Sequence, residues 1–251
     1  RGLEDLSIGA LLPQMHGDLR LMRAVKDEEE IALMKRAQAI TDAAFAHMLE
    51  FIRPGLTEKQ IKLELENFMF ENGADGLAFG SIVAAGPNAA NPHAIPSDRP
   101  VQKGEFVLMD YGARYHDYDS DMTRTVAVGE PSAKMREIYD LVQRTHEECA
   151  KAVYAGVDGN EIHELSRKII GDAGYGEYYG HGLGHGVGID IHEEPVLAPR
   201  NERPLAADNV VTVEPGIYLP GKFGMRLEDF GVVTADGFDV FTNSTHDLVV
   251  I

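Results

Sequence analysis

The sequence predicts an α+β fold built from two similar halves, each with two helices followed by strands. Helical periodicity and strand-like runs follow one another twice along the chain. The turn Gly55-Leu56-Thr57 returns as Gly156-Val157-Asp158, and Gly73 returns as Gly174, both at an offset of 101 residues (156 − 55 and 174 − 73). These observations predict an internally duplicated fold with pseudo-two-fold symmetry.

Length and composition are those of a globular protein. The 251 residues are 44% hydrophobic and 25% charged, which is enough chain for a sizeable core. A net charge of −18 argues against nucleic acid or an anionic membrane as a partner, because phosphate binding relies on clustered Lys and Arg. No apolar run approaches the roughly 20 residues that span a bilayer, and no signal-peptide pattern is seen. The single Cys149 excludes an internal disulfide and fits the cytoplasm.

The first pair of helices follows an irregular start. Residues 1–22 mix short apolar pieces with Gly and Pro, which is typical of a tail or linker. Acidic residues 27–30 favour a helix N-terminus, and apolar residues then recur at helical spacing up to residues 53–55. A second helix is expected from Thr57, with a capping-box glutamine three residues later, to residues 72–73.

The second pair repeats this order. A third helix is expected over about 132–154, ended by Gly156. A fourth is expected to open at Asp158, with Glu161 as its capping-box partner, and to stop at residues 173–174.

Strands follow each helix pair, and those of the first half form a hairpin that carries Asp110 and Asp121. Residues 106–109 and 123–128 have strand composition and flank a polar turn near 116–119, which predicts an antiparallel pair. Two carboxylates close together at the edge of a core would repel, and one would stay protonated unless a cation intervened. A metal site is the first interpretation, and two turn residues on an acidic surface are the alternative.

The second half carries a corresponding pair of carboxylates. Glu214 follows the strand-like run 209–213, and Glu228 follows 224–227. Their offsets from the two aspartates are 104 and 107 residues (214 − 110 and 228 − 121), close to the repeat length. Four carboxylates, two per half, would then face one another near the pseudo-two-fold axis.

Three histidines, His181, His185 and His192, lie within a glycine-rich stretch between these strands. Glycine at alternate positions lets other backbone or a ligand approach closely, and the spacing does not match the dinucleotide motif G-x-G-x-x-G. A lone histidine would be interpreted as a hydrogen-bonded core residue. Three histidines beside four candidate carboxylates indicate metal chemistry instead.

The ligand types predict the metal and the reaction. Oxygen-rich ligation with one imidazole suits Mn, Co, Fe or Zn, and four carboxylates balance two divalent ions. Two such ions roughly 3.5–4 Å apart can share a bridging water, lower its pKa and polarise a carbonyl, so the expected reaction is metal-assisted hydrolysis. There is no G-x-S-x-G serine motif, and His163-Glu164 lacks the second histidine of H-E-x-x-H.

These residues resemble the metal centre of the pita-bread metallopeptidases, the methionine-aminopeptidase-like family M24. The strings DYGA, YDSDMTRT, HGLGHGVGIDIHEEP and VEPGIY resemble in particular the Xaa-Pro dipeptidase (prolidase) and aminopeptidase P branch. The resemblance implies a pita-bread catalytic domain over residues 23–251 that binds two divalent ions per chain, with Mn expected first and Co, Zn or Fe as alternatives. The implied metal ligands are Asp110, Asp121, His185, Glu214 and Glu228.

The resemblance also implies roles for other residues. His93 matches the histidine that stabilises the tetrahedral intermediate, and His192 matches the one that contacts the substrate around the scissile bond. Arg226 would hold a ligand carboxylate, and His181 and Tyr218 match positions that line a proline pocket. The alternatives are a loop histidine for His93, an exposed cation for Arg226 and a packing aromatic for Tyr218.

The implied substrate is an Xaa-Pro dipeptide or a peptide with proline at the second position. An Xaa–Pro bond has no N–H, so a metal that grips the free N-terminus and the carbonyl avoids the need to read that hydrogen. A metal-bridging hydroxide would attack the carbonyl, and the leaving nitrogen would take a proton by way of Glu214. Members of this branch usually carry an N-terminal domain with dimer contacts, so we expect this chain, which begins at Arg1, to be the catalytic domain of a homodimeric protein.

Dipeptidase and aminopeptidase activities both stay open. A methionyl aminopeptidase is disfavoured by residues 225–228 and by the histidines at 181 and 185. A creatinase-like hydrolase and a non-catalytic peptide-binding module of the same fold are further alternatives. Non-catalytic relatives of this fold typically lose ligands, and none of the five is missing here.

Overall fold

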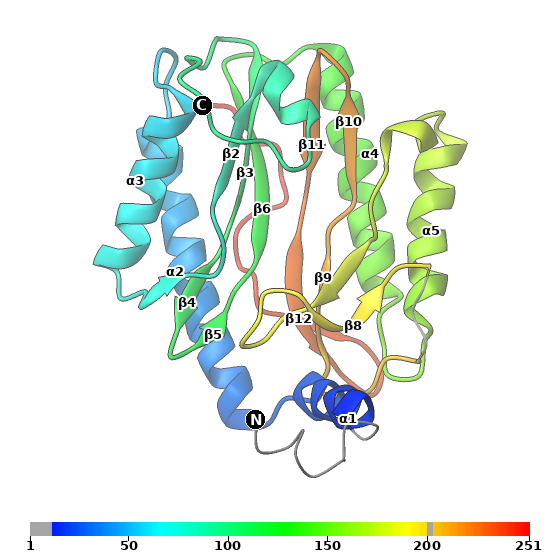
Figure 1. Cartoon of the computed structure of the whole chain (residues 1–251). Coiled ribbons are helices and arrows are strands. Elements are labelled where there is room, and N and C mark those ends of the chain that lie inside the picture. The colour runs from blue at the N-terminus through cyan, green and yellow to red at the C-terminus, as the bar shows by residue number, and fades with distance from the viewer. Residues whose placement is uncertain (1–11, 200–202) are drawn as a thin grey trace.

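The computed structural model describes residues 12–199 and 203–251. Figure 1 shows pairs of helices on either side of a central group of strands, with α1 (Leu12–Ala24) below them. Residues 12–22, which the sequence analysis expects to be part of a tail or linker, are helical. Pro13 lies in the first turn, where its missing N–H removes no helical hydrogen bond, so it does not act as a breaker. Residues 1–11 lie outside the described part.

Four further helices flank the strands. They are α2 (Glu28–Phe51), α3 (Glu58–Glu71), α4 (Ala133–Lys151) and α5 (Gly159–Asp172). The capping box of Thr57 and Gln60 at the start of α3 forms as predicted. Asp158 caps α5 by accepting from the N–H of Asn160 at 2.9 Å, one position earlier than the predicted partner Glu161. None of the described helices combines the length and apolar character that crossing a membrane requires.

The sequence repeat has a counterpart in the backbone. Gly55 and Gly156, which precede the second helix of each pair, have φ angles of 94° and 104°. Gly73 and Gly174, which follow those helices, have φ angles of 98° and 87°. Residues with a side chain rarely adopt such values. Equivalent glycines therefore make the same turns in both halves.

The strands of the first half form an antiparallel sheet in the order β2-β3-β6. Its strands are β2 (Ile82–Ala85), β3 (Glu105–Tyr111) and β6 (Met122–Val128). The predicted hairpin is confirmed: β3 pairs with β6, and Asp110 lies opposite Thr123. The polar turn at His116 and Asp117 joins two short strands that extend the hairpin, β4 (Ala113–Tyr115) and β5 (Tyr118–Asp119), which pair with each other. Strand β1 (Gly76–Leu77) pairs with β4.

The second half has a five-stranded sheet in the order β13-β12-β9-β7-β8 and a separate β10-β11 hairpin. The strands are β7 (Gly184–Gly186), β8 (Glu193–Leu197), β9 (Val210–Val213), β10 (Gly216–Leu219), β11 (Phe223–Arg226), β12 (Asp229–Val233) and β13 (Phe238–Val240). Two short 3-10 helices are η2 (Gly86–Ala90) and η3 (Gly176–Tyr178). Glu214 lies between β9 and β10, and Glu228 lies between β11 and β12. Both acidic ligands predicted in the second half therefore lie at strand ends.

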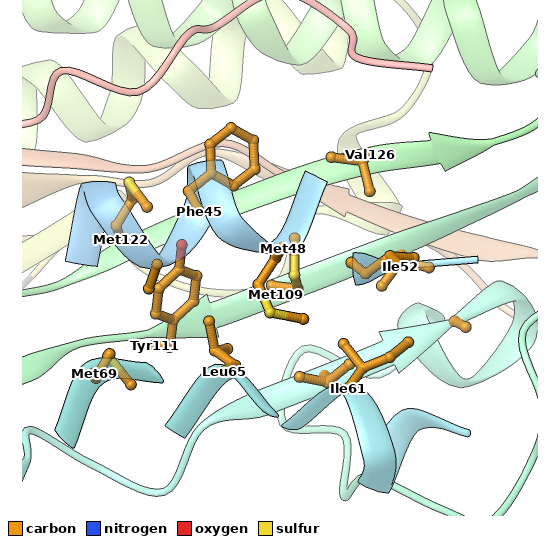
Figure 2. Close-up of a cluster of buried hydrophobic side chains, with 14 of the residues drawn as sticks. Phe45, Met48, Ile52, Ile61, Leu65, Met69, Met109, Tyr111, Met122 and Val126 are labelled. Atoms are coloured by element: carbon orange, nitrogen blue, oxygen red, sulfur yellow. The ribbon is translucent and has the colours of Figure 1, made fainter. Parts of the chain in front are cut away.

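Strands β3 and β6 present opposite faces to two cores. Met109 and Tyr111 face α2 and α3, where they join a buried cluster that includes Leu65 (Figure 2). Phe106 faces the other way and packs in a cluster with α4, β10 and β11. Because side chains alternate along a strand, Asp110 shares the face of Phe106. It is therefore turned toward the second half.

Candidate metal centre

A cavity of about 290 Å³ opens where the β3–β6 hairpin meets the strands of the second half. Nine of the ten predicted site residues line it: His93, Asp110, Asp121, His181, His185, His192, Glu214, Arg226 and Glu228. The tenth, Tyr218, forms hydrogen bonds with two of them. Its hydroxyl lies 3.0 Å from His181 Nε2 and accepts from Arg226 Nη1 at 2.7 Å. The fold thus brings together all ten residues.

The five predicted ligands converge from both halves. Ligand atoms of Asp121, His185 and Glu228 lie within 4.8 Å of one another. His185 Nε2 is 3.5 Å from Asp121 Oδ2 and 3.4 Å from Glu214 Oε1. Two ligand atoms each about 2.0–2.1 Å from one tetrahedral ion are about 3.3 Å apart, so these separations suit a shared metal. Asp110 Oδ1 is buried in the same centre and has no hydrogen-bond partner among the described residues.

Four buried carboxylates make this centre unfavourable without cations. Burial raises the pKa of Asp121 and of Glu228 well above the usual range, and neighbouring carboxylates raise both further. Burial raises the pKa of Glu214 to about 8. It also raises the pKa of Asp110, although Arg226 opposes the shift. Divalent cations would relieve this repulsion, so the donor set fits the metal ions that the sequence predicts.

Arg226 lies next to the carboxylates of Asp110 and Glu214 and is only 3% exposed. Its Nη2 donates to Asp110 Oδ2, and its Nε donates to Thr123 Oγ1 at 3.0 Å. Thr123 in turn donates to Glu228 Oε2 at 2.6 Å. Arg226 therefore orients one predicted ligand directly and a second through a threonine hydroxyl. The alternative of an exposed cation is wrong.

Sequence analysis missed two threonines that hold predicted ligands. Thr123 is one, and Thr212 is the other: its hydroxyl donates to Glu214 Oε1 at 3.3 Å and accepts from the N–H of His185 at 3.1 Å. Thr123 lies two residues after Asp121, and Thr212 lies two residues before Glu214. Alternation along a strand places such neighbours on one face, which is the signal that could have found them.

The cavity histidines His185, His192 and His93 differ in the contacts that fix their positions. His185 Nδ1 donates to the carbonyl oxygen of Gly186 at 3.0 Å, which leaves Nε2 for the carboxylate side. Burial lowers the pKa of His185 to about 4, so its ring is neutral near pH 7. The ring of His192 lies 4.4 Å from that of His185, centroid to centroid. His93 lies after η2, in a loop where its N–H bonds Asn91 Oδ1 at 3.1 Å. Both line the cavity, and their catalytic roles stay predictions.

The glycine-rich stretch allows close packing of backbone at two positions. A Cβ on Gly184 would lie 2.0 Å from the carbonyl oxygen of Thr212, and one on Gly186 would lie 2.4 Å from that of Glu194. Strand β7 is therefore wedged between β9 and β8, the strands that carry these carbonyls. Approach of other backbone explains the glycine at both positions, and Gly184 also lines the cavity.

Replacing Gly184 by alanine is expected to lower the free energy of unfolding by about 1–3 kcal/mol, the usual range for overpacking, because the clash is with backbone. Urea unfolding in the presence of a chelator measures the loss without metal effects. Gly180→Ala is the matched control, because its Cβ would meet nothing within 4 Å. Equal stability of the two variants would contradict this account of β7.

The metal-free protein is expected to lose stability as pH rises from about 7 to about 8.5. Glu214 has a folded pKa of about 8, whereas an unfolded chain ionises glutamate near pH 4.3. Between these values the folded state binds more protons, so the free energy of unfolding falls with rising pH. Buried His185 opposes this trend only below its unfolded pKa of about 6.5.

Urea unfolding at about pH 7 and at about pH 8.5, with chelator present, measures how the free energy of unfolding changes with pH. Saturating Mn²⁺ should reverse this change, because metal binding needs deprotonated carboxylates and releases their protons. A metal-free protein whose stability is constant or rises over this range would contradict the electrostatic description.

The chain is similar in sequence to known proteins. The model of metallopeptidase family M24 matches residues 32–235. The Xaa-Pro dipeptidase of Lactobacillus delbrueckii subsp. lactis is 42% identical over 231 residues, which are 92% of this chain and 63% of that protein.

Two solved structures are also similar. The X-Pro aminopeptidase of Thermotoga maritima superposes with a TM-score of 0.92 at 42% identity, over 94% of this chain and 67% of that one. The Xaa-Pro dipeptidase of Bacillus anthracis gives a TM-score of 0.91 at 45% identity, over 93% and 66%. These neighbours confirm the predicted pita-bread fold. The chain spans about two thirds of the length of the proteins that it matches.

Proposed function

The chain belongs to metallopeptidase family M24, and from this premise we propose that it carries the catalytic centre of a proline-specific peptidase that hydrolyses Xaa-Pro bonds. The observation that carries the proposal is the convergence of all five predicted ligands with His93, His181, His192 and Arg226 on one cavity. Relatives named Xaa-Pro dipeptidase and X-Pro aminopeptidase support it. The catalytic domain in this proposal is residues 23–251.

We further propose that the five ligands hold two divalent ions per chain, Mn²⁺ first and Co²⁺, Zn²⁺ or Fe²⁺ as alternatives. Such ions supply polarisation of the scissile carbonyl and a lowered pKa for the attacking water. The buried Asp110 Oδ1 without a partner and the repulsion among the carboxylates are the features of the described chain that favour them.

Glu214 is the group that we propose moves the proton. Its Oε1 accepts from Thr212, and its Oε2 lies 4.0 Å from Arg226 Nε, so the carboxylate is held in place from two sides. In the metal-free chain, burial raises the pKa of Glu214 to about 8. A proline nitrogen that leaves the broken bond needs one proton, and Glu214 would deliver the proton taken from water.

The remaining wall of the cavity suits an apolar ring. Phe79, Ile82 and Ile191 contribute to it beside His93 and His192. The two histidines can donate hydrogen bonds to substrate oxygens, while the apolar side chains can pack against the proline ring or the residue before it. Selection for proline would then come from shape and from the lack of any need for an N–H on the substrate.

The proposal is tested by measuring metal content and then hydrolysis of Ala-Pro, Ala-Pro-Ala and Met-Ala after addition of Mn²⁺. We expect near two ions per chain and cleavage of a proline peptide. Faster cleavage of Ala-Pro would indicate a dipeptidase, and faster cleavage of Ala-Pro-Ala would indicate an aminopeptidase. Preference for Met-Ala, or peptide binding without cleavage, would contradict the proposal. A homodimer and a cytoplasmic location are further parts of the proposal, to be tested by measuring the oligomeric state and the location in the cell.

A further inference from the structure

A second cluster of metal-ligating side chains lies outside the cavity just described. His146 lies on α4, Asp229 begins β12, and His246 lies in the C-terminal segment. One ligand atom from each lies within 4.8 Å of the other two. None of the three lines the candidate metal centre, and sequence analysis singled out none of them.

The distances in this cluster suit one ion. His146 Nε2 is 3.4 Å from Asp229 Oδ2, which matches the separation of about 3.3 Å expected for two ligand atoms of a tetrahedral Zn²⁺ ion. His246 Nε2 is 2.7 Å from the same oxygen. The partly exposed His246 side chain needs to withdraw by less than about 1 Å to exchange this hydrogen bond for a metal bond.

The burial of His146 without hydrogen-bond partners is the feature that points to a metal. The residue is 1% exposed, yet neither of its ring nitrogens has a hydrogen-bond partner among the described residues. A buried polar atom left without a partner destabilises the folded state. Its Nε2 lies near Asp229 but makes no hydrogen bond to it, and a metal ion between the two would satisfy it.

The surroundings fix the cluster in place. Arg124 donates to Asp229 Oδ1 at 2.7 Å, which leaves Oδ2 for the two histidines. The same guanidinium donates to the carbonyl oxygens of Ser244 and Thr245, and Tyr139 donates to that of His246 at 3.0 Å. The side chain of His246 is one-third exposed, so one side of the cluster is open to solvent.

We propose that His146, Asp229 and His246 form a second metal site, with two imidazoles, one carboxylate and a solvent-facing fourth position. Its ligand set differs from that of the candidate centre, which is rich in oxygen. Two imidazoles favour Zn²⁺, Co²⁺, Ni²⁺ or Cu²⁺, whereas Mg²⁺ and Ca²⁺ rely on carboxylates, and the single carboxylate here already shares one oxygen with Arg124. The ion joins α4, β12 and the C-terminal segment.

The site is tested in a chain that lacks two of the five predicted ligands of the candidate centre, so that the result does not depend on the proposed peptidase. In an Asp110→Asn, Asp121→Asn background, we expect equilibrium dialysis to show one tightly bound Zn²⁺ per chain. Adding His246→Asn should weaken this binding at least tenfold, since even groups that only orient ligands contribute about 10–100-fold. His116→Asn, an exposed turn histidine, is the control and should change nothing. Equal Zn²⁺ binding with and without His246 would overturn the proposal.

A second measurement keeps the proposal testable if that background does not fold. The chain without these changes, its His246→Asn variant and its His116→Asn variant are each titrated with Co²⁺, whose visible absorption is intense in tetrahedral sites. Each variant's spectrum is subtracted from that of the parent, which removes the absorption of the candidate centre that all of them share. We expect a tetrahedral spectrum that is lost in His246→Asn and kept in His116→Asn. Identical spectra in the two variants would overturn the second site.

Discussion

Replacing Asp121 by asparagine is expected to lower kcat/KM for the preferred proline peptide by at least about 100-fold at saturating Mn²⁺. Loss of groups that merely orient metal ligands already costs about 10–100-fold, and Asp121 is a predicted ligand from the hairpin at the centre of the cavity. Asp117→Asn, in the exposed turn of the same hairpin, is the matched control and should keep full activity, because asparagine tolerates the positive φ there.

Asp121→Asn lowers activity, but when metal is absent we expect it to stabilise the folded protein. Burial and the charges of Glu228 and Asp110 raise the pKa of Asp121, so its ionised form opposes folding near pH 8. The neutral amide of the Asp121→Asn variant removes that repulsion, and the free energy of unfolding in chelator should rise relative to the parent chain. Urea unfolding with chelator and with Mn²⁺ separates the two effects. A variant that is less stable in both conditions would mean that Asp121 is needed for packing and not for a cation.

Replacing Arg226 by methionine is expected to lower the free energy of unfolding by about 3–5 kcal/mol in chelator, the usual cost of removing one partner of a buried ion pair. Asp110, Thr123 and Tyr218 would all lose the guanidinium to which they are bonded. Saturating Mn²⁺ should reduce the loss, because cations would then balance Asp110. Urea unfolding in the two conditions measures both values.

The control for Arg226 is Arg136→Met. Arg136 pairs with Glu130 at the surface, where both side chains are largely exposed, so its loss should cost under about 1 kcal/mol. Arg226→Lys keeps the charge, but its three N–H donors all lie on one nitrogen, which cannot reach the partners that Nε, Nη1 and Nη2 of the guanidinium bind, so we expect it to fall between the two. Equal losses for Arg226→Met and Arg136→Met would show that the buried network contributes little to stability.

Local signals explain why so much of the fold could be predicted. The capping box at Thr57, the positive-φ glycines and the alternation of the hairpin act within a few residues, and each appears where the sequence indicates it. The predicted ligands were recognisable because most of them stand at a strand end beside a run of apolar residues. The internal repeat then related Glu214 and Glu228 to the two aspartates.

Features that depend on distant partners could not be read in the same way. Helix α1 was missed because Pro13 and Gly17 resemble loop composition, and the partner of Asp158 was misassigned by one position. The cluster of His146, Asp229 and His246 joins segments 83 and 17 residues apart (229 − 146 and 246 − 229), none with a motif. The packing of α4 against the strands and the hydrogen bonds of Arg124 and Tyr139 to the C-terminal segment bring these side chains together.

The division of the ligand set between two halves has a dynamic consequence. Asp110 and Asp121 belong to the first half, and His185, Glu214 and Glu228 belong to the second, so neither half alone offers a complete set of donors. If the five residues bind ions as proposed, the binding free energy would also stabilise the contact between the two halves. Amide hydrogen exchange in β3 and in β9 should slow together when metal is added, and release of the ions should accompany any opening between the two halves.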